Sequence, residues 1–414
     1  MTHTHLVPRL LAHLRDGYTP GDLSADALAG LAVAIVSLPL AMALAIASGV
    51  TPERGLFTAI VAGLIISVFG GSRVQIGGPT GAFVVIVYAV VERHGYNGLI
   101  TATFMAGLLL IALGLARFGR MIKFIPYPVT TGFTAGIAVV IFSSQIKDFL
   151  GLSLERVPSQ FMAKWGAYLD ALHTASLPTV GVGCASLLAL IAFRRWAPRM
   201  PASLIVVIGA AAVVSLGGLP VETIGSRFGE IPQTLPAPAW PPFDLSMVGE
   251  LIPAALTIAL LAGVESLLSA VVADGMTGDR HSSDMELVAQ GAANVASVFF
   301  GGIPATGAIA RTAMNVRSGA RTPIAGVLHA LFLLSFMVFL APYLKLVPLT
   351  TLAAILFVVA WNMAHLDHFR RLFKAPPSDT LVLLASFGLT VLVDLTVAVE
   401  VGVVLAALLF MKRM

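Results

Sequence analysis

Long apolar runs separated by short polar segments recur along the whole chain. Examples are LAGLAVAIVSLPLAMALAIASGV at 28–50 and GLLLIALGLA at 107–116. Runs of this length are typical of transmembrane helices, because about twenty helical residues cross the hydrocarbon core of a bilayer. The pattern predicts an all-α polytopic membrane protein with fourteen spans, at 31–48, 54–70, 80–91, 98–117, 124–148, 177–194, 203–217, 247–273, 285–300, 306–317, 324–341, 349–363, 379–393 and 396–411. The third and tenth spans are too short to cross as plain helices.

The composition supports a protein that lies in a lipid bilayer. Of its 414 residues 57% are hydrophobic and 11% are charged, and the mean hydropathy is +0.93; soluble domains carry about 25% charged residues. The first 27 residues are polar and do not resemble a cleavable signal peptide. The net charge of +4 comes without a basic stripe interleaved with aromatic residues, so no nucleic-acid partner is expected.

The distribution of lysine and arginine predicts how the spans are oriented. With the N-terminus in the cytoplasm, most of these residues fall in the two termini and in the loops that follow even-numbered spans. Such an excess marks cytoplasmic segments. We therefore expect an even number of spans, a location in the cell (inner) membrane, and both termini in the cytoplasm.

A proline-rich segment at 218–246 divides the chain into two halves of seven spans each. Because seven is odd, the second half must enter the membrane from the opposite side, so the halves form an inverted repeat. The expected organisation is a cytoplasmic segment at 1–27, a first repeat at 28–217, an extracytoplasmic linker at 218–246, and a second repeat at 247–414.

Matching glycine- and proline-rich motifs precede the short third span of each half. They read GGSRVQIGGPTGAF at 70–83 and GGIPATGAI at 301–309. Discontinuous helices at matching places of inverted repeats indicate a transport site near the bilayer midplane. Two helix N-termini meeting there would offer free N–H groups and partial positive charge to an anion. Two tight turns at the membrane surface are the alternative, but the match between the motifs favours the site.

The residues around these motifs are the candidates for the site. We expect 74–76 and 303–305 to run extended and to pair as short strands, which would satisfy backbone groups that lipid cannot. Gln75 either donates a hydrogen bond to the substrate or faces this strand pair, and Leu44 is expected to form an apolar wall. The residues predicted to line the site from the two short helices are Thr80, Gly81, Ala82, Phe83, Thr306, Gly307, Ala308 and Ile309.

Two charged residues lie inside apolar spans, where a charge is costly and usually functional. Arg311, in the tenth span, is predicted to hold the anion. Glu265, in the middle of the eighth span, is a natural proton carrier, because an apolar environment favours the protonated carboxyl. The alternative is a permanent Glu265–Arg311 ion pair without a transport role. The chain offers no metal-ligand spacing, P-loop or nucleophile–base motif, so we expect neither an enzyme nor a cofactor or metal site.

Four stretches of the chain resemble the sulfate permease (SulP) family of anion transporters. They are 37–63 (SLPLAMALAIASGVTPERGLFTAIVAG), 70–83, 260–278 (LLAGVESLLSAVVADGMTG) and 301–326 (GGIPATGAIARTAMNVRSGARTPIAG). The resemblance implies a core domain of spans 1–4 and 8–11 that moves against a gate domain of spans 5–7 and 12–14, often in homodimers. It also implies a basic residue beside the anion at Arg311, and Glu265 fits the proton-coupled members. Family members usually continue into a cytoplasmic STAS domain, whereas this sequence ends at Met414 after the last predicted span.

The function expected from these features is secondary active transport of a small anion such as sulfate, bicarbonate or a dicarboxylate, by symport with a proton. An anion exchanger and an anion channel of the same fold remain alternatives. A nucleobase permease shares this architecture, but it would need polar or acidic side chains to read base edges. Glu265 would suit that function, whereas Arg311 and the IARTA sequence at 309–313 favour an anion.

Overall fold

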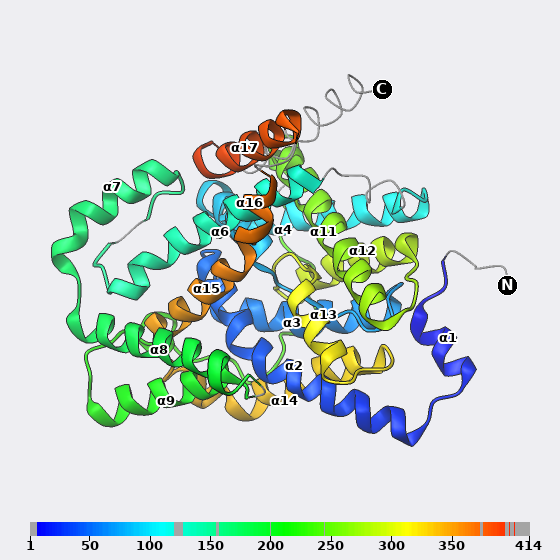
Figure 1. The fold of residues 1–414 in the computed structure, drawn as a ribbon, viewed down its shortest axis with the longest axis horizontal. Coiled ribbons are helices and arrows are strands. Elements are labelled where there is room, and N and C mark those ends of the chain that lie inside the picture. The colour runs from blue at the N-terminus through cyan, green and yellow to red at the C-terminus, as the bar shows by residue number, and fades with distance from the viewer. Residues whose placement is uncertain are drawn as a thin grey trace. The chain divides into compact units, whose positions relative to one another are not determined.

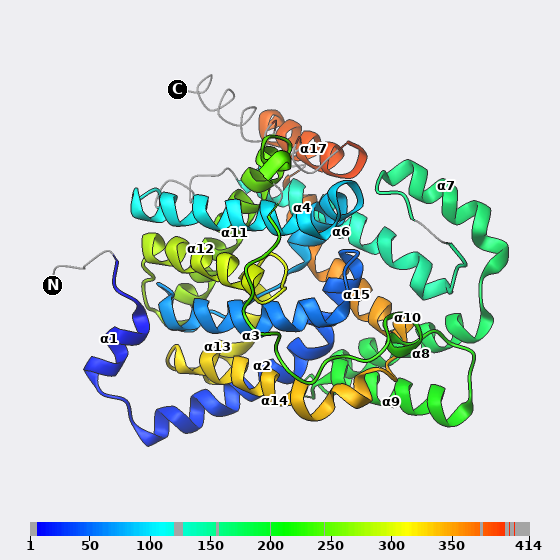
Figure 2. The same ribbon diagram turned by 180° about the vertical axis from the view of Figure 1, so that it is seen from behind.

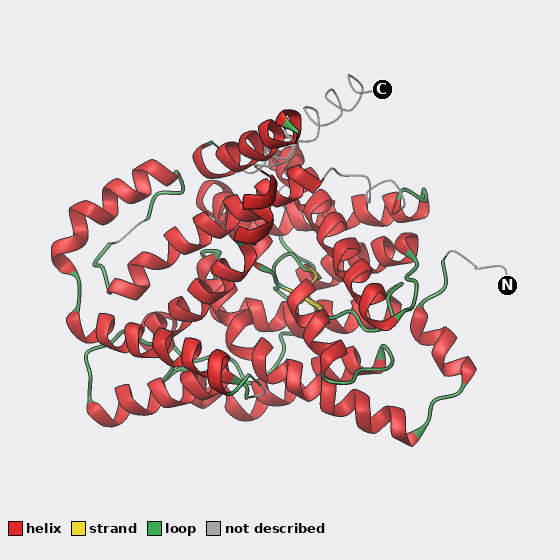
Figure 3. Ribbon diagram, viewed as in Figure 1, coloured by secondary structure: helices red, strands yellow, loops and turns green. Residues whose placement is uncertain are grey.

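The structure is a computed structural model that describes residues 6–119, 127–154, 157–198, 200–243, 245–372, 376–393, 397 and 401. Figure 3 shows that the described part is almost entirely helical, with two very short strands. The chain forms two compact units. The first comprises Met1–Phe83, Arg93–Phe124 and Glu230–Pro342, and the second comprises Val84–Glu92, Ile125–Gly229 and Tyr343–Met414.

The first unit draws its elements from both halves of the sequence (Figure 1). They are α1 (Arg9–Asp16), α2 (Pro20–Ala47), α3 (Pro52–Phe69), β1 (Gly77–Gly78), most of α4 (Gly81–Leu115), η2 (Leu245–Met247), α11 (Val248–Thr277), α12 (Ser283–Phe299), β2 (Thr306–Gly307), α13 (Ile309–Arg317) and nearly all of α14 (Ile324–Leu344). Figure 2 shows α12 beside α3, and α13 beside α2.

The second unit is likewise built from both halves. Besides the middle part of α4, its elements are α6 (Tyr127–Leu150), α7 (Phe161–Ala171), η1 (Leu172–Thr174), α8 (Leu177–Trp196), α9 (Ala202–Gly217), α10 (Ile224–Phe228), α15 (Leu349–Met363), α16 (Leu366–Leu372) and α17 (Pro377–Leu392). Within this unit α6 packs against α15 and α17.

Each predicted span before 396–411 coincides with a helix, whereas 396–411 falls almost wholly outside the described residues. The third and fourth spans form one continuous element, α4, which breaks its helical geometry only at Gly95 (φ 67°, ψ −175°) instead of having a loop. Seven described helices are long and apolar enough to cross a membrane, and α9, α15 and α17 are shorter apolar helices. The helices α12 and α13 are short and carry many polar side chains, which serve the site described below.

Local sequence explains where several helices begin and how closely they pack. Thr19 and Asp22 form a reciprocal capping box at the start of α2, with Pro20 in the first helical position. Where α4 crosses α12, a Cβ added at Gly291 would lie 2.4 Å from the carbonyl oxygen of Gly107. Small residues permit such close backbone approach between membrane helices.

The strands β1 and β2 pair antiparallel, with Gly77 opposite Gly307 and Gly78 opposite Thr306. The predicted pairing of the two motifs is therefore present, but it lies at 77–78 and 306–307 and not at 74–76 and 303–305. One reason is Pro304, which has no N–H group to donate to a ladder. Another is that side chains of neighbouring helices already bind the backbone of 74–76 and 303–305.

Candidate functional site

The two strands each lead directly into a helix N-terminus. The helix α4 begins at Gly81 after Thr80, and α13 begins at Ile309 after Ala308; neither preceding residue caps its helix with a side-chain hydrogen bond. The first backbone N–H groups of both helices thus lack the usual side-chain acceptor. Since helix N-termini carry partial positive charge, this arrangement suits an anion.

Side chains of α12 bind the backbone on both sides of the strand pair. The carboxylate Oε2 of Glu286 accepts hydrogen bonds from the N–H groups of Gly71 (2.9 Å) and Ser72 (3.1 Å). Asn294 donates to the carbonyl of Ala305 (2.8 Å) and accepts from its N–H group (2.9 Å). These bonds replace the water that such irregular backbone would otherwise need inside a membrane.

The helix α3 binds the second loop in a similar way. Thr58 Oγ1 accepts a hydrogen bond from the N–H group of Ile303 (2.7 Å), and Arg54 Nη1 donates to the carbonyl of Gly301 (3.0 Å). Each loop is thus held by a helix from the other half of the sequence, since α12 binds the loop before β1 and α3 binds the loop before β2.

The helix α13 also binds the backbone of the segment before β1. Thr312 Oγ1 accepts hydrogen bonds from the N–H group of Ile76 (3.1 Å) and the hydroxyl of Ser269 (2.9 Å). Asn315 donates to the carbonyl of Val74 (2.9 Å). The residues around β1 are therefore positioned by a dense set of buried hydrogen bonds.

Arg311 lies buried against β1, with only 4% of its surface exposed. Its Nη2 donates to the carbonyl of Pro79, while Nη1 is buried without a hydrogen-bond partner. A Cβ added at Gly78 would lie 2.6 Å from Nη1, and Gly78 has a φ of +150°. A buried donor without a partner is costly, and an anion bound here would remove that cost.

Glu265 is partly buried on α11 and accepts a 2.8 Å hydrogen bond at Oε2 from the hydroxyl of Thr80. It forms no ion pair with Arg311 among the described residues. The alternative of a permanent Glu265–Arg311 pair therefore does not describe this structure. Thr80 instead connects the carboxylate to the start of α4.

Three other predicted site residues, Gln75, Thr306 and Gly307, lie in or against β2. Gln75 Nε2 donates to the carbonyl of Ser266 (3.3 Å), and a Cβ at Gly307 would lie 1.5 Å from this nitrogen, so Gln75 lies against β2. Thr306 and Gly307 belong to β2 and not to the second helix, and the Thr306 hydroxyl donates to the carbonyl of Ala262 (2.8 Å).

The small and apolar candidates are buried close to the helix starts. Gly81, Ala82 and Phe83 form the buried first turn of α4, and Ala308 is buried directly before Ile309. Leu44 is 2% exposed within α2, the helix against which α13 packs.

Sequence reasoning missed the polar face of α12. Glu286, Gln290, Asn294 and Ser297 recur every three or four residues, and all four are fully buried. This spacing places them on one side of a helix. Polar residues repeated at helical spacing within the predicted span 285–300 could have identified α12 as a helix that binds buried backbone.

Comparison with known proteins agrees with this fold. The Sulfate permease family matches residues 23–386. YvdB of Bacillus subtilis is 45% identical over 400 residues, which are 96% of this chain and 75% of that protein. The bicarbonate transporter BicA of Picosynechococcus sp. is 31% identical over 404 residues, 95% of this chain and 71% of BicA.

A solved structure shares the architecture. The transmembrane domain of a cyanobacterium bicarbonate transporter BicA superposes with a TM-score of 0.84 at 30% identity, covering 92% of this chain and 98% of that one. The family match extends over most of the chain, including both strand–helix motifs. The chain therefore belongs to the sulfate permease family and is a multi-pass membrane transporter, not an enzyme.

Proposed function

We propose that this protein is a secondary active transporter that binds a small anion between the starts of α4 and α13. The buried guanidinium of Arg311, whose Nη1 has no hydrogen-bond partner, is the observation that carries the proposal. Two helix N-termini without side-chain caps add partial positive charge beside it. An anion would satisfy all of these donors at once.

Transport is coupled to a proton carried by Glu265. The carboxylate accepts a hydrogen bond from Thr80, the residue directly before α4. An ionised Glu265 opposes an incoming anion, because like charges in a poorly screened site repel. Protonation removes that repulsion, so the proton and the anion enter the site together. No direct ion pair joins the carboxyl of Glu265 to the guanidinium of Arg311 in the described part of the structure.

Sulfate, bicarbonate and small dicarboxylates are the substrates to consider. The family name refers to sulfate, and the printed name of BicA refers to bicarbonate. One guanidinium and two helix dipoles are enough for a divalent anion. The residues Gly81, Ala82 and Ala308 are small, which suits a compact oxyanion and is also compatible with a short carbon skeleton.

The transport cycle alternates access by moving a core domain against a gate domain. The site residues named here all lie in the first unit, which we assign to the core, and the second unit acts as the gate. We place the protein in the cell (inner) membrane with both termini in the cytoplasm, as a homodimer.

Uptake of labelled anions into proteoliposomes tests the binding site. We expect saturable uptake of sulfate, bicarbonate or a C4-dicarboxylate by the wild type, and a loss of at least about a hundredfold in Arg311→Gln. Arg317→Gln is the matched control, because Arg317 is exposed at the end of the same helix and should leave uptake unchanged. Wild-type uptake by a folded Arg311→Gln variant would remove Arg311 from the site.

A further inference from the structure

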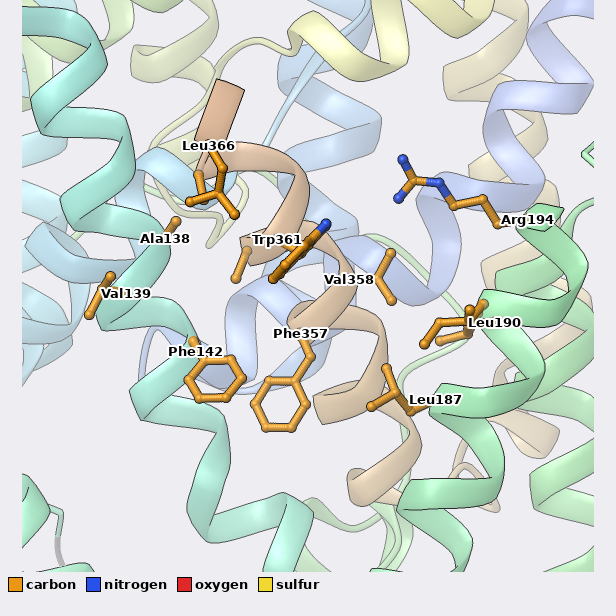
Figure 4. Close-up of a pocket in the computed structure, with 13 residues that line it drawn as sticks. Ala138, Val139, Phe142, Leu187, Leu190, Arg194, Phe357, Val358, Trp361 and Leu366 are labelled. Atoms are coloured by element: carbon orange, nitrogen blue, oxygen red, sulfur yellow. The ribbon is translucent and has the colours of Figure 1, made fainter. Parts of the chain in front are cut away.

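A cavity lies entirely within the second unit. It has a volume of about 730 Å³, which lies in the range of sites that hold organic ligands. Figure 4 shows that α6, α8 and α15 supply most of its walls. The lining residues are Ala138, Val139, Phe142, Leu187, Leu190, Ile191, Arg194, Phe357, Val358, Ala360, Trp361, Ala364 and Leu366. We call this cavity the α6–α8–α15 groove.

The groove is lined by aliphatic and aromatic side chains apart from one arginine. The rings of Phe142 and Phe357 stack with their centroids 4.5 Å apart, and Trp361 beside them is 68% exposed. Because α6 and α8 are long and apolar enough to cross a membrane, an apolar surface between them is suited to lipid hydrocarbon. It matches the hydrocarbon of an acyl chain, which can fill a channel between helices without needing hydrogen bonds.

Arg194 supplies the polar end of the groove. Its Nη1 donates a 2.7 Å hydrogen bond to Oδ1 of Asn362 on α15, which holds the guanidinium at the groove while the side chain stays exposed. A guanidinium binds phosphate oxygens through paired N–H groups, and no carboxylate is among the groove's described lining residues to compete for it. The next residue but one, Trp196, is 83% exposed, as is typical of tryptophan at the lipid headgroup level.

We propose that the α6–α8–α15 groove is a binding site for an anionic glycerophospholipid. One acyl chain lies against Phe142, Phe357 and Trp361, and the phosphate binds Arg194. The bound lipid fills the space between three helices of the second unit. The net negative charge of the headgroup favours this lipid over a zwitterionic one, in which a choline or ethanolamine cation offsets the phosphate.

Quenching of tryptophan fluorescence by brominated acyl chains tests the site directly. The purified protein in detergent micelles is titrated with dibrominated phosphatidylglycerol or dibrominated phosphatidylcholine. The part of the quenching that disappears in Trp361→Phe measures the binding of lipid in the groove. For this part we expect half-maximal quenching at about fivefold lower mole fraction of phosphatidylglycerol than of phosphatidylcholine.

Variants of two neighbouring arginines distinguish a specific lipid site from non-specific attraction to positive surface charge. Arg194→Gln should abolish the preference for phosphatidylglycerol, whereas Arg195→Gln, an exposed neighbour outside the groove lining, should retain it. Val358→Phe should reduce the Trp361-dependent quenching by both lipids, because the larger ring fills the groove without adding a second indole. Equal quenching by the two lipids, or a preference that survives in Arg194→Gln, would overturn the proposal. So would the lack of any Trp361-dependent quenching, which is the result expected if a second copy of the chain covers the groove.

Discussion

At the scale of single residues, the site depends on a charged side chain that the fold buries but does not fully pair. Arg311 has one hydrogen bond to the backbone at Pro79 and one guanidinium nitrogen without a partner. Its position requires glycine at residue 78, because a side chain there would collide with Nη1. Burial of an unpaired cation costs free energy, and this cost supports the proposal that Arg311 binds the anion.

Gly78→Ala tests this close approach. The added Cβ would lie 2.6 Å from the end of the Arg311 side chain, which is flexible enough to move without unfolding the protein. We expect a folded variant whose uptake falls between about tenfold and a hundredfold, because the guanidinium is displaced from the anion. The control is Gly319→Ala after α13, where φ is also positive (+95°) but a Cβ would meet no atom within 4 Å. Equal uptake by the two variants would show that the position of Nη1 does not matter.

Glu265→Gln tests the proton carrier. Glutamine keeps the shape of the side chain and can still accept the hydrogen bond from Thr80, but it cannot exchange a proton. We expect uptake in this variant to lose the pH dependence that the wild type shows, because the amide cannot take up or release a proton. Glu250→Gln, at an exposed position of the same helix, should keep the wild-type profile. An unchanged profile in Glu265→Gln would assign proton coupling to another group.

At the scale of elements, the sequence was most informative where glycine and proline interrupt apolar runs. Proline fixes φ and lacks an N–H group, and glycine permits non-helical backbone, so both mark helix boundaries. The start of α4 is accordingly found at Gly81, one residue from its predicted start at 80. The second helix begins three residues later than predicted, at Ile309, because Thr306 and Gly307 are used in β2. The side chains that hold the loops were not predictable, since contacts such as Thr58 with Ile303 join residues far apart in sequence.

The short helix α7 carries a lysine that should make stability depend on pH. Lys164 is 3% exposed, and burial lowers its pKa to about 8 in spite of nearby Glu92. Between about pH 8 and pH 10.4, the pKa of an unperturbed lysine, the unfolded chain binds more protons than the folded one, so stability rises with pH in this window. Below about pH 8 the folded state bears the full cost of the buried charge.

Lys164→Met should remove that cost while keeping the apolar stem of the side chain. We expect its Tm to exceed that of the wild type by roughly 2–5 °C at pH 7, with the difference shrinking as the pH approaches about 10. Lys345→Met is a suitable comparison, because Lys345 is only partly buried. Thermal unfolding in detergent, followed at both pH values, checks this. A difference in Tm that stays constant with pH would show that Lys164 keeps its charge throughout.

At the scale of the whole molecule, each compact unit is assembled from both halves of the chain. The first unit combines segments before Phe124 with Glu230–Pro342, and it contains both strand–helix motifs. The proposed anion site would therefore be completed only when the second half of the chain has been made and has packed against the first. Both strand–helix motifs lie in the first unit, whereas the α6–α8–α15 groove belongs to the second.

Symport of a proton with the anion is the central claim, and proton flux driven by an anion gradient tests it most directly. Proteoliposomes containing a pH-sensitive dye are diluted into buffer with the transported anion and no initial pH gradient. We expect the lumen to acidify with wild-type protein, and to stay at constant pH with Glu265→Gln although the variant is folded. Saturable anion uptake by the wild type without acidification would contradict symport and indicate an exchanger or a channel.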